Sequence, residues 1–533
     1  MYKKNYENYE FLENWSKKTI GDHIREWSET YKDKLAVIDN LREITFQELY
    51  KRSCEIASGL LEIGIRPGDS IVLQIPNSVT FVEVFFGCII MGAIPILALP
   101  AHRKSDLNGI FKLAEPRAYF IKDSYMGFDY ISLAREIKKE HFSVEHIFVD
   151  TDKDIEGCIK ISDIKGENRN FQMCSAYETA LLLLSGGTTG TPKLIPRTHA
   201  DYIYNSVTAA LKCKVTEKSV YLSILPIAHN FSLSCPGLLG VLGKGGTIVM
   251  SPSGSPDEAL PLIEEKRVTM TAMVPALIPI FSEMLDMDLG YDISSLELLQ
   301  VGGALLEPAV AQRICEDWPC KLMQVFGTAE GLICFTDLED SDEIIINYQG
   351  RPISPADEIK IVDEEGKEVG YGEYGELLAR GPYTIDGYYK LPEVNKQVIT
   401  EDGFYRTGDR ATYDLVKGLK MGGRIKEQIN RAGEKIMPAE IERYLCEHKL
   451  IEEAAVIGVP DEELGYKSVA FIKYYREVEK NEKVTRKDIS EYFSKLGVAA
   501  YKIPDVVIDV EQWPVTSVGK IDKKQLINIV VER

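Results

Sequence analysis

The chain has 533 residues, which is too long for one ordinary hydrophobic core and predicts two or more domains. Hydrophobic residues make up 45% of it and charged residues 27%, a balance typical of soluble globular proteins. Its formal net charge of −20 excludes a general nucleic-acid-binding protein, because such proteins carry a basic surface.

The N-terminal sequence MYKKNYENYEFLENW lacks the apolar segment of a signal peptide, so we expect a cytoplasmic protein. The ten cysteines are scattered without a C-x-x-C pair, which predicts reduced thiols. Together with the dispersed histidines, they predict no structural metal held by protein ligands alone. The apolar run from Phe85 to Pro100 is too short to span a membrane and contains Gly92 and Pro95. We therefore interpret it as a helix followed by a buried strand and expect no membrane partner.

The predicted elements begin with a strand at 70–76, a helix at 79–91 and a strand at 94–99, which form a βαβ unit. Further strands, at 297–303 and 321–327, end in glycine at positions where parallel sheets usually bind ligands. After about residue 345, short strands and turns predict a β-rich subdomain. From Pro438 onward, helices alternate with strands. The fold class is therefore α/β, with a large N-terminal domain of mixed, mostly parallel sheets covered by helices and a small α+β C-terminal domain.

The loop SGGTTGTPK, from Ser185 to Lys193, follows a strand of leucines and combines three glycines, four hydroxyl side chains and a lysine. Such a loop brings many backbone and side-chain donors close to an anion, which favours a phosphate site over a plain polar surface loop. It is not a P-loop, because Thr191 and Pro192 separate Gly190 from the lysine and Leu194 follows it.

The SGGTTGTPK loop resembles the signature of the adenylate-forming superfamily, which includes acyl-CoA synthetases, adenylation domains of peptide synthetases and luciferases. Five further stretches occur in that family's order and bring the resemblance to nearly the whole chain: QVFGTAEG (324–331), GELLARGPYTIDGYY (375–389), YRTGD (405–409), GRIKEQINRAGEKI (423–436) and SVGKIDKK (517–524). The resemblance implies ATP and Mg²⁺ as cofactors. It also implies residues 1–425 as the adenylation core and residues 426–533 as a mobile domain that rotates about a hinge near Lys426.

The resemblance also implies roles for individual residues. Lys520 would bridge the substrate carboxylate and the α-phosphate; composition alone favours a solvated lysine among its neighbours Lys523 and Lys524, so this role depends on the S-V-G-K spacing. Thr328 would bind the α-phosphate, Glu330 would hold Mg²⁺, and Gly433 would border the tunnel of the acceptor thiol. The remaining nucleotide contacts would be Ser185, Gly186, Gly187, Thr188, Thr189, Gly190 and Lys193 at the phosphates, Gly302, Gly303, Ala304, Val325, Phe326 and Gly327 around the adenine, and Asp409 and Arg424 at the ribose.

The stretch LPIAHNFSLSCPG (225–237) resembles the aryl-acid branch, whose stand-alone members activate 2,3-dihydroxybenzoate or salicylate for siderophore synthesis. His229 would lie by the carboxylate, Asn230 would bind the 2-hydroxyl group, and Phe231 would form a ring wall. Cys235 stands where dihydroxybenzoate enzymes typically carry serine, and Ile333 where they carry valine. A thiol is larger and a weaker donor than a hydroxyl, and isoleucine is larger than valine, so both residues favour salicylate, with 2,3-dihydroxybenzoate a close second.

The stretch holds no aspartate to pair with a substrate ammonium, so an amino acid substrate is not expected. The acceptor implied for the second step is a phosphopantetheinylated aryl carrier protein supplied in trans. Two alternatives remain open: an aryl-CoA ligase that uses free coenzyme A, and a non-catalytic sensor of aryl acid and nucleotide. The sensor is disfavoured because Lys193, Glu330, Asp409, Arg424 and Lys520 are all present.

Overall fold

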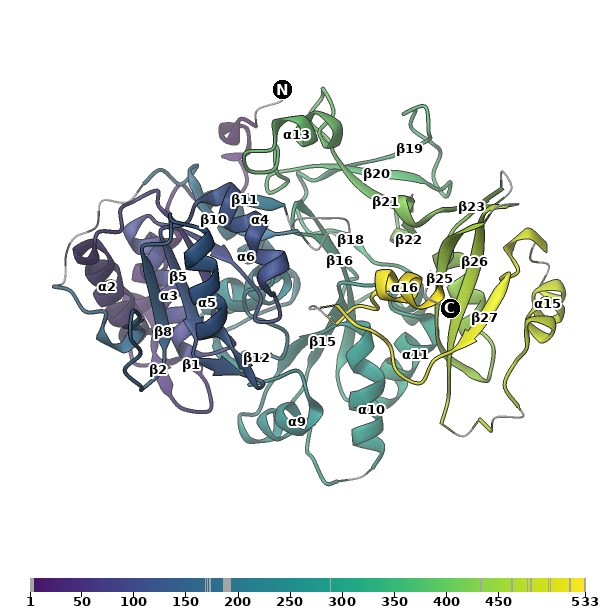
Figure 1. Cartoon of the computed structure of the whole chain (residues 1–533), viewed down its shortest axis with the longest axis horizontal. Helices are drawn as coiled ribbons and strands as arrows, with labels where there is room; N and C mark the ends of the chain where they lie inside the picture. The colour runs from purple at the N-terminus through teal and green to yellow at the C-terminus, as the bar shows by residue number, and fades with distance from the viewer. Residues whose placement is uncertain are drawn as a thin grey trace.

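The computed structural model describes residues 4–167, 169, 171, 174–185, 193–287, 289–431, 434–461, 464–476, 478–479, 482–496, 498, 500–516 and 519–531. Two large sheets with helices packed between them form most of the N-terminal part, in purple, blue and teal in Figure 1. A β-rich subdomain lies above them in green, and the C-terminal part lies to the right in yellow-green and yellow.

The first sheet has seven strands. In spatial order they are β11 (Leu194–Thr198), β10 (Thr179–Leu184), β4 (Ile94–Leu97), β3 (Ser70–Gln74), β5 (Ala118–Lys122), β8 (His146–Asp150) and β9 (Ile159–Lys160). All neighbouring pairs are parallel except β10 and β11, which form a hairpin around the SGGTTGTPK loop. The predicted βαβ unit is confirmed, because helix α3 (Val79–Met91) connects the paired parallel strands β3 and β4.

The second sheet has nine strands and carries most of the predicted adenine residues together with Thr328 and Ile333. In spatial order they are β18 (Arg351–Pro352), β17 (Gly331–Phe335), β16 (Lys321–Thr328), β15 (Leu298–Gly302), β14 (Met270–Met273), β12 (Val220–Ser223), β13 (Thr247–Met250), β1 (Leu35–Ile38) and β2 (Glu43–Thr45). Strands β1 and β12 to β16 pair in parallel, whereas the outer strands β2, β17 and β18 run antiparallel.

Helices cover both faces of both sheets. The layer between the sheets contains α1 (Ile20–Tyr31), α2 (Phe46–Ile63), α3, α6 (His199–Lys212), α7 (Asn230–Ser234) and α8 (Gly237–Gly243). The outer faces carry α4 (Lys104–Ala114) and α5 (Tyr130–Glu140) on one sheet, and α9 (Pro256–Glu265), α10 (Ile278–Asp286), α11 (Pro308–Asp317) and α12 (Asp342–Asn347) on the other. Because α3 is buried along nearly its whole length, its sequence is apolar on every side except at Thr80 and Glu83. Among the described residues, no helix is both long and apolar enough to cross a bilayer.

The β-rich subdomain and the C-terminal domain confirm the predicted change after residue 345. The subdomain contains β19 (Glu358–Val362), β20 (Gly375–Arg380), β21 (Tyr405–Asp414) and β22 (Gly418–Arg424), with α13 (Pro392–Val398) beside them. The C-terminal domain contains the hairpin β23 (Ile429–Arg431) and β24 (Glu434–Ile436), the sheet β25 (Ile451–Asp461), β26 (Gly465–Tyr474) and β27 (Val506–Asp509), and helices α14 (Pro438–Cys446), α15 (Arg486–Lys495) and α16 (Lys523–Val531). Its apolar residues form hydrophobic clusters of their own.

Candidate active site

The candidate site lies beyond the carboxyl ends of β15 and β16, where Gly302 pairs with Val325. A Cβ atom on Gly302 would lie 2.6 Å from the carbonyl oxygen of Val325 and 3.3 Å from the ring of Phe231. Glycine is therefore required here, because only a bare backbone allows the ring to approach so closely. The next residue, Gly303, has φ +85°, which glycine adopts without strain.

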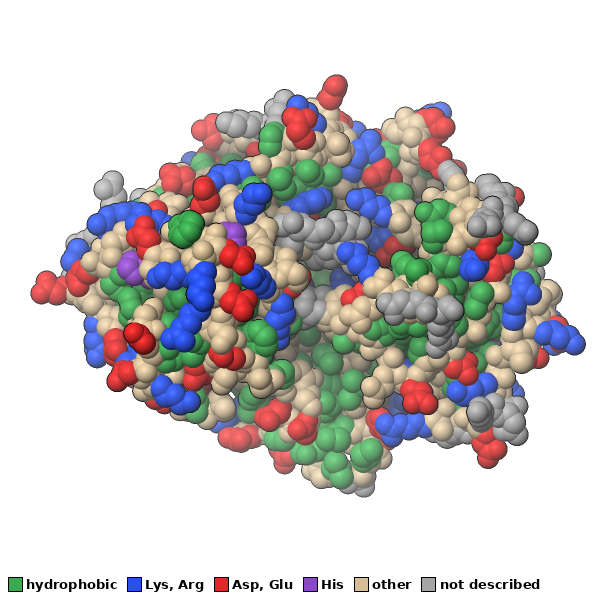
Figure 2. Space-filling view, in the orientation of Figure 1, with side chains coloured by type: hydrophobic (Ala, Val, Ile, Leu, Met, Phe, Trp, Pro, Cys, Tyr) green, Lys and Arg blue, Asp and Glu red, His purple; other side chains and the backbone are tan. Residues whose placement is uncertain are grey.

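Lys520 reaches this edge of the sheet from the far end of the chain. Its Cε lies 3.9 Å from the position of a Cβ on Gly303, and a Cβ on the preceding Gly519 would lie 3.3 Å from Cγ2 of Val274, just after β14. Burial and the charge of Arg424 lower the pKa of Lys520, whereas Asp409 and Glu427 raise it. The structure thus brings the C-terminal lysine next to the N-terminal nucleotide residues. In Figure 2 the surface is hollowed between these two parts of the molecule.

Lys523, three residues further on, is held by two ion pairs. Its Nζ lies 2.7 Å from a carboxylate oxygen of Glu427 and 2.8 Å from one of Glu442. These ion pairs connect the start of α16 to η4 (Ile425–Glu427) and to α14. They hold the chain segment next to Lys520 in place within the C-terminal domain.

His229 and Asn230 begin the short helix α7. The Nδ1 atom of His229 accepts a hydrogen bond from the backbone N–H of Phe231 at 3.3 Å, so the side chain caps the helix. Burial and the nearby charge of Lys520 lower the pKa of His229 to about 4, so its ring is neutral at pH 7. A neutral imidazole with Nδ1 occupied as an acceptor keeps its Nε2–H as a donor.

The orientation of Asn230 is set by two hydroxyl groups. Its Oδ1 accepts from the Tyr202 hydroxyl at 2.9 Å and from Ser234 Oγ at 3.2 Å. The Nδ2 group faces the sulfur of Cys235 at 3.8 Å and remains a donor for a ligand. Tyr202 was not singled out from the sequence, because only the fold brings α6 against α7.

Cys235 and Ile333 are buried in the same hydrophobic cluster as Phe231. Burial raises the pKa of the Cys235 thiol to about 11, so this group is a neutral, weak donor. Ile333 lies opposite Gly327 across β16 and β17, with its Cγ1 3.4 Å from the position of a Cβ on that glycine. Both residues therefore have apolar, buried surroundings.

Glu330 and Lys193 are joined through Tyr388, another residue that was not singled out. The Tyr388 hydroxyl donates to Glu330 Oε1 at 2.7 Å, and Lys193 Nζ lies 4.6 Å from the centre of the tyrosine ring. Burial and the charge of Lys426 lower the pKa of Lys193, while Glu330 opposes them. Lys426 is exposed and lies in η4.

Thr328 closes the turn that carries Glu330, since its Oγ1 donates to the carbonyl of Gly331 at 2.7 Å. Its hydroxyl must rotate away from Gly331 before it can donate to a phosphate. Phe326 is half-buried against a cluster that contains Leu332, while its neighbour Val325 faces the main core. Ala304 is exposed just beyond β15.

The two ends of the SGGTTGTPK loop are tied together. The backbone N–H of Ser185 donates to the carbonyl of Lys193 at 2.9 Å, and the N–H of Lys193 donates to Ser185 Oγ at 3.0 Å. The predicted contacts within the loop, Gly186, Gly187, Thr188, Thr189 and Gly190, lie outside the described residues, as does Gly433.

Asp409 and Arg424 face each other across β21 and β22. Arg424 Nε lies 2.8 Å from Asp409 Oδ1, whereas Asp409 Oδ2 is buried and has no hydrogen-bond partner. A buried acceptor without a donor is costly, and a ribose diol would supply the missing donors. Burial raises the pKa of Asp409 to about 6, and Arg424 opposes this shift.

We expect ATP binding to weaken as the pH falls below about 6, the pKa of Asp409. The carboxylate form accepts hydrogen bonds and predominates above this pH, whereas protonation turns one oxygen into a donor. The KM for ATP should rise by up to about tenfold for each pH unit below the pKa. Steady-state kinetics on both sides of pH 6 would measure this, with Asp409→Asn for comparison. An equally steep rise in the variant would assign the effect to another group.

The residues at the site fit a nucleotide with a bound Mg²⁺. Within the described part of the chain, no three His, Cys, Asp or Glu side chains gather as a metal site of their own. Glu330 presents one carboxylate next to Lys193, which suits Mg²⁺ because this ion takes one or two carboxylates together with phosphate oxygens. We therefore place the ion with the nucleotide and not in a separate cage.

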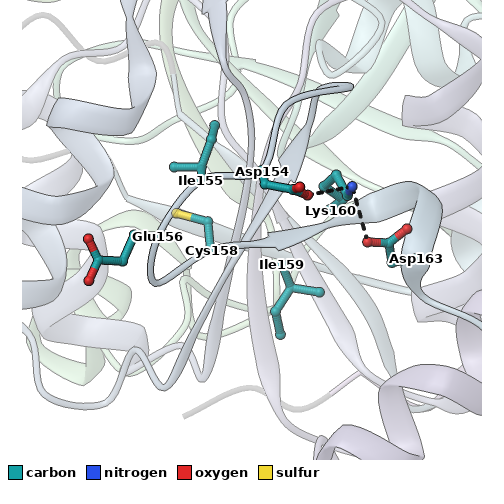
Figure 3. Close-up of a pocket in the computed structure, with 7 residues that line it drawn as sticks. All are labelled: Asp154, Ile155, Glu156, Cys158, Ile159, Lys160 and Asp163. Carbon is teal, nitrogen blue, oxygen red and sulfur yellow. Dashed lines mark hydrogen bonds and ion pairs between the residues drawn. The ribbon is translucent and has the colours of Figure 1, made fainter.

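A separate pocket on the outer edge of the seven-stranded sheet holds none of the predicted site residues. Its lining residues are Asp154, Ile155, Glu156, Cys158, Ile159, Lys160 and Asp163 (Figure 3). Lys160 already pairs with Asp154 at 2.7 Å and lies 3.7 Å from Asp163, so its charge is satisfied within the pocket. The geometry thus leaves the edge of β15 and β16 as the candidate active site.

Comparison with known proteins identifies the family of the chain. The family described as AMP-binding enzyme matches residues 24–389, and the AMP-binding enzyme C-terminal domain matches residues 440–520. The 2,3-dihydroxybenzoate-AMP ligase of Bacillus subtilis is 42% identical over 97% of this chain and 95% of its own. The salicyl-AMP ligase / salicyl-S-ArCP synthetase of Mycobacterium tuberculosis is 38% identical over 96% of this chain and 91% of its own.

The solved structures include the apo form of MbtA from Mycobacterium smegmatis, which is similar in sequence as well as in fold. It superposes with a TM-score of 0.75 at 38% identity and covers 98% of this chain and 97% of its own. The site geometry, the two family matches and these full-length relatives lead to one conclusion. The chain belongs to the AMP-binding family of adenylate-forming enzymes and is an aryl acid-AMP ligase.

Proposed function

We propose that the enzyme joins salicylate to ATP and then transfers the aryl group to the phosphopantetheine thiol of an aryl carrier protein. The first step gives salicyl-AMP and pyrophosphate, and 2,3-dihydroxybenzoate is the second-ranked substrate. The observation that carries this proposal is the Asn230 amide, which is fixed by Tyr202 and aimed at the apolar end formed by Cys235. The name of the mycobacterial relative supports the carrier protein as acceptor, and siderophore synthesis is the proposed use of the product.

In the adenylation step a carboxylate oxygen attacks the α-phosphorus, the bond to the bridging β-phosphate oxygen breaks, and pyrophosphate leaves. Two anions must meet in line, so the protein contributes positioning and positive charge. Lys520 supplies a charge beside Gly303, and neutral His229 can donate a hydrogen bond to the carboxylate. Mg²⁺, held by Glu330, would neutralise charge on the phosphates.

The ribose and the phosphates are held by different parts of the site. Asp409 Oδ2 would accept from the ribose hydroxyls, with Arg424 beside it. Ser185 and Lys193 tie the ends of the loop that would bind pyrophosphate. For the second step we propose a rotation of residues 426–533 about Lys426, which removes Lys520 from the site and admits the thiol past Gly433. Hinge residues absorb such a change in backbone angles and need not be small.

The aryl pocket explains the preference for salicylate. The Nδ2 group of Asn230 can donate to the 2-hydroxyl oxygen, because its Oδ1 is already occupied by Tyr202 and Ser234. A 3-hydroxyl group would meet the buried Cys235 thiol, which offers a weak partner. The discrimination is modest, since an apolar pocket rejects an added hydroxyl poorly.

The substitution Cys235→Ser is expected to raise the kcat/KM for 2,3-dihydroxybenzoate relative to salicylate by about 3- to 10-fold, the value of one neutral hydrogen bond. The measurement is the rate of ATP–pyrophosphate exchange with each acid, over a range of acid concentrations. Cys320→Ser is the matched control, because this cysteine is equally buried but lies in the hydrophobic cluster on the outer face of the nine-stranded sheet. An unchanged ratio in Cys235→Ser would show that this position does not contact the 3-hydroxyl.

The function as a whole is tested by ATP–pyrophosphate exchange driven by single acids: salicylate, 2,3-dihydroxybenzoate, benzoate, 3-hydroxybenzoate, amino acids and fatty acids. We expect salicylate to give the fastest exchange. A lead for 2,3-dihydroxybenzoate would keep the adenylation mechanism and overturn the assignment of Cys235 and Ile333. An absence of exchange from folded protein with Mg²⁺ would contradict the proposed enzymatic function and favour the non-catalytic sensor.

The acceptor is tested separately, with salicyl-AMP formed in place and either carrier protein or coenzyme A added. Faster loading of the carrier protein supports the proposed second step. Faster formation of salicyl-CoA would make the protein an aryl-CoA ligase.

A further inference from the structure

The N-terminal segment, which the proposed mechanism does not use, packs against the segment 382–386 near the other end of the N-terminal domain. Lys4 Nζ donates to the carbonyl of Pro382 at 3.2 Å and to the carbonyl of Thr384, and its backbone N–H donates to Asp386 Oδ2 at 3.4 Å. The N-terminus and the green segment leading to α13 lie together at the top of Figure 1. One ammonium group thus holds two carbonyls of a loop that is otherwise distant in sequence.

Aromatic rings fix this segment in place just after Lys4. The helix η1 (Tyr6–Tyr9) begins with Tyr6, whose ring stacks on that of Tyr177 with 5.5 Å between the ring centres. Tyr177 also donates to Glu10 at 2.6 Å, which ties the far end of the same segment. Such stacked rings bury much apolar area, so the segment has a defined conformation.

The segment 382–386 directly supports the backbone of Glu330. The N–H of Ile385 donates to the carbonyl of Glu330 at 2.7 Å. A Cβ atom on Gly331, where φ is +136°, would lie only 2.3 Å from Cα of Thr384, so the two chains touch backbone to backbone. A shift of the segment would therefore move the turn that carries the Glu330 carboxylate.

The other side of this turn rests on a buried ion pair. Arg197 is completely buried, pairs with Asp201 at 2.9 Å, and donates through Nη1 to the carbonyl of Ala329 at 3.1 Å. The charges of Asp201 and Arg197 both act on Lys4, together with those of Asp386 and Asp357. Lys4 therefore lies within electrostatic range of the ion pair that supports Ala329.

We propose that Lys4 is a positioning residue for Glu330: it holds the segment 382–386 against the Glu330 backbone and so orients the carboxylate toward the nucleotide phosphates. This inference rests on the proposed function, because the role of Glu330 at the phosphates is part of it. Lys4 is not a catalytic residue, since its ammonium group is engaged by backbone carbonyls.

The test is Lys4→Met, which keeps the apolar stem and removes the donor, assayed by ATP–pyrophosphate exchange in the full-length enzyme. We expect the KM for ATP and the Mg²⁺ concentration for half-maximal rate to rise about 3- to 10-fold, which corresponds to one lost hydrogen-bonding group. The KM for the aryl acid should stay within about twofold, because the Asn230 pocket does not depend on this segment. A general loss of structure would instead raise the KM for ATP and the KM for the aryl acid alike.

The matched control is Lys17→Met, since Lys17 is also an N-terminal lysine but its exposed ammonium pairs with Glu10 and not with the segment 382–386 among the described residues. We expect it to behave as the parent enzyme. Lys4→Arg should restore most of the response to Mg²⁺, because a guanidinium can also donate to two carbonyls. If Lys4→Met does not fold, Asp386→Ala removes the partner of the Lys4 backbone and should change the ATP and Mg²⁺ dependence in the same direction.

Two outcomes would overturn the proposal. The first is an unchanged Mg²⁺ response in Lys4→Met, or in Asp386→Ala if Lys4→Met does not fold. The second is an equal increase in the KM for ATP and in the KM for the aryl acid. The proposed function fails differently, by an absence of exchange in the parent enzyme. The two failures are therefore distinguishable in one set of assays.

Discussion

Replacing Lys520 with alanine is expected to slow the formation of aryl-AMP by about 10²- to 10³-fold, the usual cost of removing one group that stabilises charge in a transition state. The lysine lies beside Gly303 and near His229, where the attacking carboxylate and the α-phosphate would meet. It is a mobile point charge, which suits a contact made in only one of the two steps. The rate of ATP–pyrophosphate exchange would measure the loss of adenylation activity in the first step.

The second step should be spared. Thioester formation from supplied aryl-AMP should proceed at nearly the parent rate, because we propose that Lys520 has left the site by then. Lys524→Ala is the matched control, since Lys524 is exposed four residues away and should affect neither step. Equal losses in both half-reactions would contradict the proposed departure of Lys520.

Glu330→Gln is expected to lower the rate of adenylation by about 10²-fold or more and to increase the Mg²⁺ requirement. Glutamine keeps the shape and still accepts the hydrogen bond from Tyr388, so the substitution removes mainly the negative charge. The measurement is the exchange rate as a function of Mg²⁺ at saturating ATP.

A matched control is available in Glu83→Gln, because Glu83 is also a buried glutamate but pairs with Arg42, far in sequence from the site. This variant should lose stability more than activity, since it leaves the arginine without its partner. If Glu330→Gln kept the parent response to Mg²⁺, the carboxylate would not be a ligand of the ion.

Much of the architecture could be predicted because it depends on local patterns. The apolar strand at 70–74, the mostly apolar helix α3 and the strand at 94–97 are short-range signals, and the βαβ unit was correct in type and order. The change near residue 345, from alternating strands and helices to short strands and turns, could be predicted for the same reason. The expected fold class was confirmed in its two domains and in its mostly parallel sheets.

The candidate site was less accessible to sequence reasoning, because its decisive contacts join distant segments. Tyr388 belongs to the stretch GELLARGPYTIDGYY, yet nothing in the neighbouring residues indicates that its hydroxyl group contacts Glu330, 58 residues earlier. Tyr202 likewise orients Asn230 from another helix. The fold also places Lys523 between Glu427 and Glu442, a contact that no local pattern indicates.

By itself, the sequence determined the family resemblance and the residues available for chemistry, since glycine loops, charges and hydroxyls at fixed spacing are properties of the local chain. The tertiary structure alone decided which atoms are available to a ligand and which are already bonded. Oδ2 of Asp409 has no donor, Nδ2 of Asn230 faces Cys235, and the ammonium group of Lys4 is bonded to backbone carbonyls. The physical reason is that burial and hydrogen-bond partners come from residues hundreds of positions apart, and these set the pKa and the orientation of each group.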